Sequence, residues 1–116
     1  LDIKQIDGVK HQELTGVSNE RTLAIVDLME EEGQPYWVRH VVVPGYTDGE
    51  EDLTGLARFL QEKKYLERVE LLPYHNLGAY KWQELGLKYE LGDVKPPDQK
   101  KMKEIRDLFR AYGLKV

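Results

Sequence analysis

The sequence predicts an α/β fold in which parallel strands alternate with helices. Short apolar runs of strand length alternate along the chain with longer segments of helical periodicity. Their order is strand, helix, strand, helix, strand, helix, which implies right-handed crossovers between parallel strands. The length of 116 residues is that of one domain. We therefore expect one α/β layer or part of a barrel, because three strands cannot close a barrel by themselves.

The first half of the chain supplies two of the three expected strands. A short strand, LDIKQI, is expected over 1–6, followed by a short turn of helix over 7–16. Helical periodicity then runs over 19–33, with apolar residues on successive turns and Gly33 as the stop. The second strand, over 36–43, ends at Pro-Gly.

An arginine interrupts the apolar run of this second strand. Arg39 has valine, tryptophan and histidine as its nearest neighbours in a segment that otherwise has the composition of a buried strand. A buried guanidinium is costly unless it has an anionic partner or lies in a wet cavity. The position of Arg39 therefore indicates a site.

The second half of the chain repeats the alternation. A helix is expected to begin at Asp48, which has the spacing of a capping box with Glu51. The third strand is expected over 68–74. The remaining expected segments are a short helix over 76–86, an extended loop over 86–97 and a last helix over 99–113.

Composition excludes several functions. The 17 Lys and Arg and the 21 Asp and Glu give a net charge of -4 with both signs scattered, so no basic face for nucleic acid is expected. Neither a membrane-spanning run nor a signal peptide is present, which favours the cytoplasm. The lack of cysteine excludes disulfides and thiolate metal sites. Because the chain starts without Met, we expect it to be a piece of something longer.

Polar side chains gather near the expected strands. A period of two puts Asp2 and Lys4 on one face of the first strand, and His75 comes just past the third. Parallel α/β folds bind ligands at the carboxyl ends of their strands, so these residues and Arg39 indicate a partial ligand site. The residues expected to share a face with Arg39 are Trp37, Val41 and Val43.

Structural interpretations of the same residues stay open. Asp2 and Lys4 are also explained by an exposed ion pair on a frayed edge, and Arg39 by extension to solvent from an edge strand. His11 is expected on a helix surface and His40 on the helix-facing side of its strand. The sequence has no Gly-rich phosphate loop, Ser-His-Asp pattern or His-Glu-x-x-His helix, so its chemistry predicts no more than a partial ligand site.

Five stretches carry a family resemblance: LDIK, LTGVSNERTL, WVRHVVVPGYTD, VELLPYHNLGAYKW and DVKPPDQKKMK. In this order and spacing they resemble the C-terminal part of the pyruvate formate-lyase activating enzymes, which are glycyl-radical-enzyme activases of the radical S-adenosylmethionine superfamily. The resemblance implies the C-terminal half of a partial (β/α)6 TIM-like barrel, with 1–116 as a single partial domain. It also implies S-adenosylmethionine and a [4Fe-4S] cluster as cofactors. The family's cluster-binding cysteine loop lies upstream of the matching part, so this chain is expected neither to hold the cluster nor to be active alone.

The resemblance assigns roles to individual residues. The family's Asp-x-Lys matches Asp2, Ile3 and Lys4, which would contact the ribose and carboxylate end of S-adenosylmethionine. Asp2 would also help to hold a monovalent cation. The family's strand arginine matches Arg39, and its Pro-Tyr-His places His75 at the bound cofactor. No residue of this chain is expected to be catalytic.

The resemblance also implies a reaction and its partners. In the family, the reduced cluster cleaves S-adenosylmethionine, and the 5'-deoxyadenosyl radical installs a glycyl radical on pyruvate formate-lyase. Flavodoxin or ferredoxin is the expected electron donor. Two alternatives stay open: an activase for a different glycyl radical enzyme, and a non-enzymatic half-barrel that binds a nucleotide or a partner. The chain is also expected to self-associate through the edge of its first strand or its open half-lumen.

Overall fold

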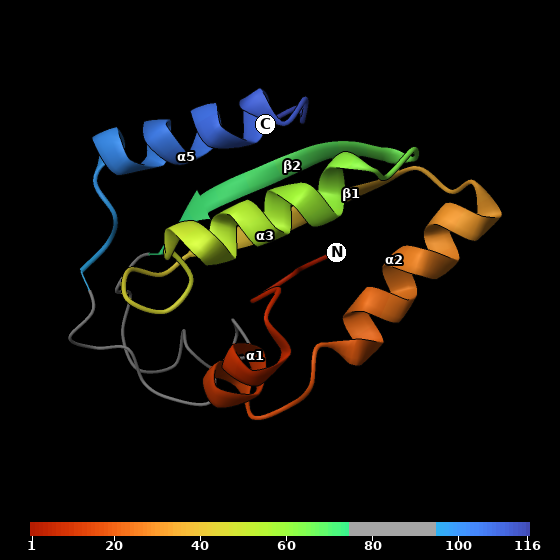
Figure 1. Cartoon of the computed structure of the whole chain (residues 1–116), viewed down its shortest axis with the longest axis horizontal. Helices are drawn as coiled ribbons and strands as arrows, with labels where there is room; N and C mark the ends of the chain where they lie inside the picture. Colours follow the sequence, from red (N-terminus) through yellow and green to blue (C-terminus); the bar gives the residue numbers. More distant parts are fainter. Residues whose placement is uncertain (75–94) are drawn as a thin grey trace.

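The structure, a computed structural model, describes residues 1–74 and 95–116. It confirms an α/β chain in which two parallel strands alternate with helices (Figure 1). The described elements are α1 (Gly8–Thr15), α2 (Glu20–Glu32), β1 (Tyr36–Val42), α3 (Glu50–Gln61), β2 (Leu66–Pro73) and α5 (Gln99–Ala111). The helix expected over 76–86 and most of the loop expected over 86–97 lie outside the described residues.

The first segment of the chain, residues 1–6, joins the parallel β1–β2 pair at a single bridge, between Asp2 and Arg39. The backbone N–H of Arg39 donates to the carbonyl of Leu1 at 2.8 Å, and the N–H of Ile3 donates to the carbonyl of Arg39 at 3.0 Å. The expectation of a regular strand over 1–6 is therefore wrong. Beyond Ile3 the chain turns away from β1 towards α1, and side chains bond its backbone.

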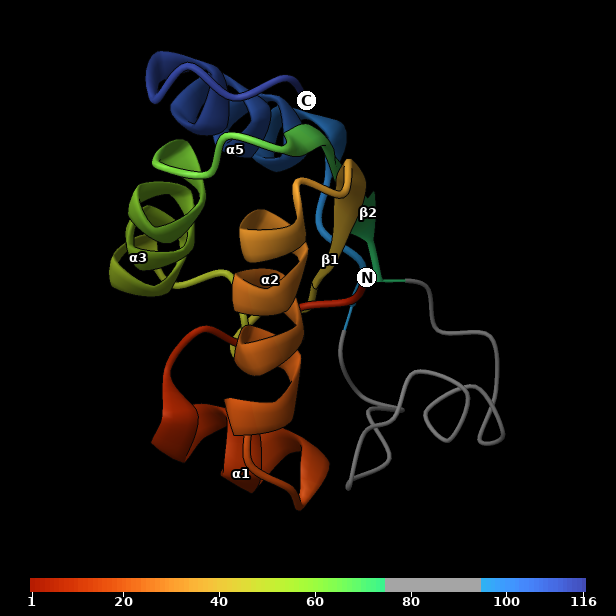
Figure 2. The same ribbon diagram turned by 90° about the vertical axis from the view of Figure 1, so that its right-hand side faces the viewer.

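Helices α2 and α3 lie on the same side of the sheet (Figure 2). The sequence of β1 explains this arrangement, because its side chains alternate between two environments. Tyr36, Val38 and Val42 are buried, whereas Trp37 and Arg39 are exposed. We call the side that bears Trp37 and Arg39 the open face of the sheet.

Helices α3 and α5 complete the core with apolar stripes. The buried residues of the two helices are Leu53, Leu56, Ala57, Leu60, Met102, Ile105 and Phe109. They recur at intervals of three or four residues, which puts them on one side of each helix. No helix in the described part of the chain is long and apolar enough to cross a membrane.

The start of α3 differs from the expected capping box. Its N-cap is Gly49, which offers no side chain for a hydrogen bond. Asp48 instead accepts the backbone N–H of Gly45 at 2.8 Å, so its carboxylate stabilises the turn after β1. By contrast, α5 has a side-chain cap, because Asp98 accepts the N–H of Lys101 at 2.7 Å.

Candidate functional site

Arg39 extends from the open face of β1 and meets Asp2 of the first segment. The guanidinium donates from Nε to Oδ1 of Asp2 at 2.9 Å and from Nη2 to Oδ2 at 3.4 Å. The Arg39 side chain is 53% exposed, so the cost of burying a guanidinium does not arise here. The bridge between the two backbones sets this side-chain contact, because paired residues on neighbouring strands project to the same face.

Lys4 completes a cluster of three charged side chains, which we call the Asp2 cluster (Asp2, Lys4 and Arg39). Its ammonium donates to Oδ2 of Asp2 at 3.1 Å. The Lys4 side chain is 19% exposed and that of Asp2 38%. Asp2 and Lys4 are two residues apart and lie on the same face, as the sequence predicted. One carboxylate is thus held between two cations from different segments of the chain.

The electrostatics of the cluster favour an anionic ligand. Partial burial raises the pKa of Asp2, but the hydrogen bonds and positive charges of Arg39 and Lys4 outweigh it and hold that pKa below its ordinary value. The hydrogen bond to Asp2 raises the pKa of Arg39 in turn. At neutral pH the Asp2 cluster therefore carries two positive charges and one negative charge. Such a site can bind a carboxylate through its cations and a hydroxyl group through Asp2.

The other two predicted site residues have different positions. The side chain of Ile3 is buried, with 1% exposure, so only its backbone can face a ligand beside Asp2 and Lys4. His75 lies outside the described residues, and its place relative to the cluster stays a prediction. The structure thus brings together three of the residues that the sequence singled out.

Three further expectations concern residues that are not members of the cluster: one valine and two histidines. Val43, expected on the open face, is buried, because β1 ends at Val42 and the alternation stops there. His11, expected on a helix surface, is buried too, with Nδ1 2.7 Å from the carbonyl of Val17. His40 is buried on the helix-facing side of β1, as predicted.

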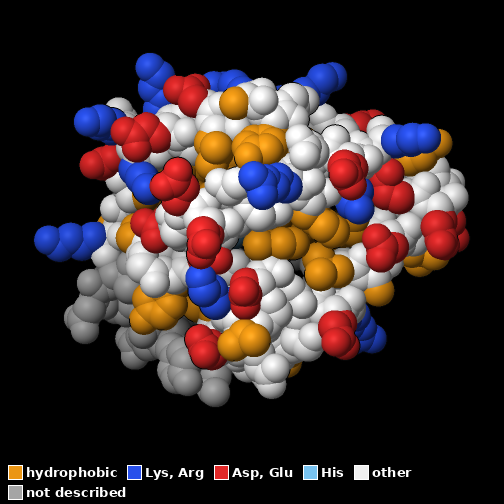
Figure 3. All heavy atoms as spheres, viewed as in Figure 1, with side chains coloured by type: hydrophobic (Ala, Val, Ile, Leu, Met, Phe, Trp, Pro, Cys, Tyr) orange, Lys and Arg blue, Asp and Glu red, His pale blue; other side chains and the backbone are white. Residues whose placement is uncertain are grey.

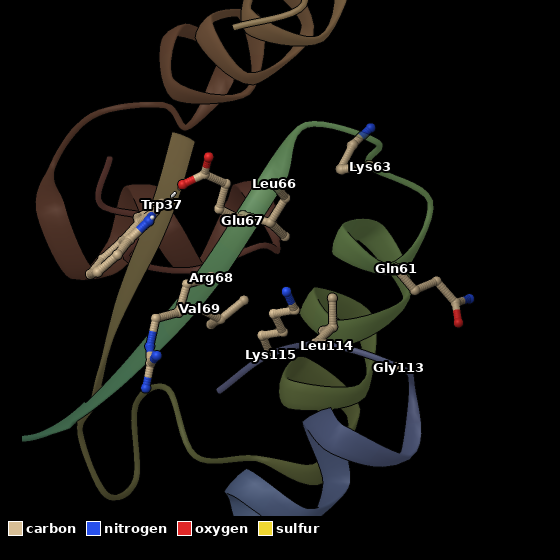
Figure 4. A pocket seen from close by; sticks show the side chains of 10 residues that line it. All are labelled: Trp37, Gln61, Lys63, Leu66, Glu67, Arg68, Val69, Gly113, Leu114 and Lys115. Atoms are coloured by element: carbon tan, nitrogen blue, oxygen red, sulfur yellow. Dashed lines mark hydrogen bonds between the residues drawn. The ribbon is translucent and has the colours of Figure 1, made fainter. Parts of the chain in front are cut away.

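A cavity of about 560 Å³ lies near the amino end of β2. Leu66, Val69 and Lys115 contribute to its wall (Figure 4). At its edge, Nε1 of Trp37 donates to Glu67 at 3.2 Å. No member of the Asp2 cluster lines this cavity, and ligands of parallel α/β folds bind at the opposite ends of the strands. The cavity is therefore not the candidate site.

Charge is mixed over the face that α3 occupies. Acidic and basic side chains alternate there without a region of one sign (Figure 3). One of the contacts between opposite charges joins Lys10 of α1 to Asp52 of α3 at 2.9 Å. A phosphate backbone needs a continuous basic stripe, which this face does not provide.

The sequence did not indicate that buried polar side chains would support the cluster. Gln5, Asn19, His40 and Thr47 are each at most 5% exposed. All four bond backbone groups of the first segment, of β1 or of the turn after β1, at sequence separations of up to 41 residues. No periodicity predicts such contacts. The signal available in the sequence was the presence of polar residues within otherwise apolar stretches.

The fold and the Asp2 cluster define a class: an α/β chain of parallel strands whose open sheet face carries a cluster of two cations and one carboxylate. Comparison with known proteins narrows this class to one group of homologues. The chain is 40% identical over 116 residues to the pyruvate formate-lyase 1-activating enzyme of Escherichia coli (strain K12), covering 100% of this chain and 47% of the relative. It is 47% identical over 103 residues to the pyruvate formate-lyase-activating enzyme of Staphylococcus aureus (strain USA300), covering 89% and 41%. The chain is homologous to pyruvate formate-lyase-activating enzymes.

A solved structure agrees with the sequence relatives. The crystal structure of a domain of pyruvate-formate lyase-activating enzyme from Bacteroides vulgatus ATCC 8482 superposes with a TM-score of 0.78 at 25% identity. The match covers 98% of this chain and 62% of that chain. No family model matches the sequence. The chain spans about half the length of the curated relatives, 47% of the Escherichia coli enzyme.

Proposed function

We propose that this chain is the S-adenosylmethionine-binding part of a radical glycyl-radical-enzyme activase that acts on pyruvate formate-lyase. In this proposal the parallel strands are part of a (β/α)6 barrel whose lumen is the open face of the sheet. The homology to pyruvate formate-lyase-activating enzymes supports the reaction class. The observation that carries the proposal is the Asp2 carboxylate held between Lys4 and Arg39 on the open face.

The chemistry of the cluster fits S-adenosylmethionine. The ligand has an α-carboxylate, for which Lys4 and Arg39 are donors, and a ribose diol, for which Asp2 is an acceptor. In the proposal the backbone of Ile3 borders the ligand, His75 approaches it from the end of β2, and Asp2 also helps to hold a monovalent cation. When bound, S-adenosylmethionine supplies the radical chemistry that removes a hydrogen atom from a glycine. The residues of this chain bind and orient it.

The chain does not fit the second cofactor of the proposed reaction. A [4Fe-4S] cluster is held by cysteine thiolates, and the sequence has none. The described residues also contain no group of three His, Asp or Glu side chains that could hold a metal ion. The residues of this chain therefore take no part in the proposed electron transfer. Pyruvate formate-lyase and an electron donor such as flavodoxin or ferredoxin are the proposed partners.

Replacing Lys4 tests the proposal. In the complete gene product, we expect Lys4→Ala to weaken S-adenosylmethionine binding by about 1 to 3 kcal/mol, the range for hydrogen bonds to charged groups. Lys10→Ala is the matched control, because Lys10 also pairs with an aspartate but lies on α1, away from the Asp2 cluster. Isothermal titration under anaerobic conditions measures both. Equal affinities for Lys4→Ala and the unmodified protein would show that the Asp2 cluster is only a structural ion pair.

A further inference from the structure

The segment that carries Asp2 and Lys4 is held by side chains rather than by a regular ladder. It has one bridge to β1, yet the carbonyls of its later residues have buried donors. Nδ1 of His40 lies 2.7 Å from the carbonyl of Ile3. Nδ2 of Asn19 donates to the carbonyl of Ile6 at 2.9 Å and to that of Gln5 at 3.3 Å.

His40 contacts the segment from the side opposite to Arg39. The two residues are consecutive on β1, so their side chains project to opposite faces. Arg39 bonds the carboxylate of Asp2 on the open face, whereas His40 bonds the next carbonyl along, that of Ile3, within the core. The two contacts together fix both the position and the rotation of the segment.

The hydrogen bond to Ile3 determines the state of the His40 ring. A carbonyl oxygen only accepts, so the nitrogen 2.7 Å from it carries the proton. Nε2 is buried and makes no hydrogen bond of good geometry within the described part of the chain, which is costly for a polar atom. Burial lowers the pKa of His40, and the nearby backbone of Thr47, which favours the charged ring, offsets this only in part. An apolar ring of the same size would fill the space without that cost. What the imidazole adds at the first segment is therefore its Nδ1–H bond to the carbonyl of Ile3.

We propose that His40 is a positioning residue for ligand binding, assisted by Asn19. It holds the Ile3 carbonyl so that the side chains on either side, those of Asp2 and Lys4, face the ligand together with Arg39. The inference rests on the proposed function, because the ligand is the S-adenosylmethionine assigned there. His40 does not touch the ligand itself. It lies on the other face of the sheet and acts through the backbone of Ile3.

The chain offers a matched control at His11. This residue is also buried, and its Nδ1 also lies 2.7 Å from a backbone carbonyl, that of Val17. Val17 is in the loop between α1 and α2, and its carbonyl is bonded by His11 and Thr15 rather than by a residue of the first segment. His11→Phe therefore removes the same kind of hydrogen bond at a place where it positions no member of the cluster.

The test measures S-adenosylmethionine affinity by isothermal titration and the thermal midpoint by circular dichroism, both in the complete gene product. We expect His40→Phe to raise the dissociation constant about tenfold, the equivalent of one hydrogen bond. His40→Asn, whose amide nitrogen occupies the place of Nδ1, should restore most of the affinity. His11→Phe should lower the thermal midpoint but leave the dissociation constant within about twofold.

A double variant separates positioning from general destabilisation. If His40 acts through the placement of Lys4, the combined effect of His40→Phe and Lys4→Ala on affinity is smaller than the sum of the two effects. Additive effects, or the same loss of affinity in His11→Phe, would overturn the inference. Should His40→Phe not fold, Asn19→Leu removes two carbonyl contacts of the same segment, and unchanged affinity in that variant overturns the inference equally. If Lys4→Ala alone has no effect, it is the proposed function that fails.

Discussion

Replacing Asp2 with asparagine should reveal how strongly the Asp2 cluster stabilises the fold. The side chain keeps its size, but the ion pair with Lys4 and the two bonds from Arg39 lose their negative partner. The Lys4 and Asp2 side chains are 19% and 38% exposed, so solvent screens their attraction only in part. We expect Asp2→Asn to lower the free energy of unfolding of the chain by about 1 kcal/mol at pH 7, the upper end for surface ion pairs.

This loss should depend on pH in a defined way. Burial raises the pKa of Asp2, but Arg39 and Lys4 outweigh it and hold the pKa below the ordinary value of 3.8. A carboxyl group whose pKa is lower in the folded than in the unfolded chain stabilises the fold above its unfolded pKa. That contribution is lost as the pH falls through the folded value. The difference between the unmodified chain and Asp2→Asn should therefore be constant above about pH 5 and shrink below pH 3.8.

Urea unfolding followed by circular dichroism measures the difference at each pH. With a denaturant slope of about 1 to 3 kcal/mol per molar, the midpoint should move by roughly 0.3 to 1 M at pH 7. Asp107→Asn is the control, because Asp107 lies 3.5 Å from Arg110 with both side chains more than half exposed, and it should move the midpoint little. Equal midpoints for Asp2→Asn and the unmodified chain, or a difference that persists undiminished in acid, would refute the electrostatic reasoning.

Two further predictions concern the chain by itself. After anaerobic reconstitution the chain should carry no cluster iron and form no 5'-deoxyadenosine, because it has no cysteine thiolate. Stoichiometric iron in the protein fraction would contradict this prediction. The chain should also self-associate, because Trp37 and Leu72 on the open face are 47% and 37% exposed. Light scattering behind a sizing column should show dimers, and Trp37→Lys should reduce their fraction. A monomer at high concentration would count against an open half-lumen.

The parts of the site that the sequence predicted depend on a local period. Asp2 and Lys4 are two residues apart in an extended segment, and Trp37 and Arg39 are two apart in β1, so each pair shares a face whatever the rest of the chain does. The same alternation correctly put His40 on the helix side of the sheet. The alternation does not predict whether another part of the chain packs on a given face. The apolar neighbours of Arg39 suggested burial, but no described helix covers the open face, and the guanidinium is exposed.

The parts that the sequence missed depend on contacts between distant segments. The pattern of 1–6 is that of a strand, but its ladder stops after one bridge, and side chains from residues 13 to 37 positions away bond its later carbonyls. The capping-box pattern at Asp48 was overridden because its carboxylate bonds the turn at Gly45 instead. His11 is buried because the carbonyl of Val17 gives its ring a partner inside the fold. Propensity and spacing contain no information on such partners.

Arg39 and His40 hold the first segment from opposite faces of β1, and they should respond to acid in different ranges of pH. Burial lowers the pKa of His40 below 6.5, so the folded chain keeps a neutral ring where the unfolded chain takes up a proton. The stability that depends on this ring therefore falls as the pH drops below 6.5, whereas the bond between Arg39 and Asp2 persists until the pH is below 3.8. The order follows from where each contact lies. The contact of His40 is neutral and lies in the core, where a charge is costly. The contact of Arg39 with Asp2 is ionic and lies at the surface, where water solvates the cations that remain once the Asp2 carboxylate is protonated.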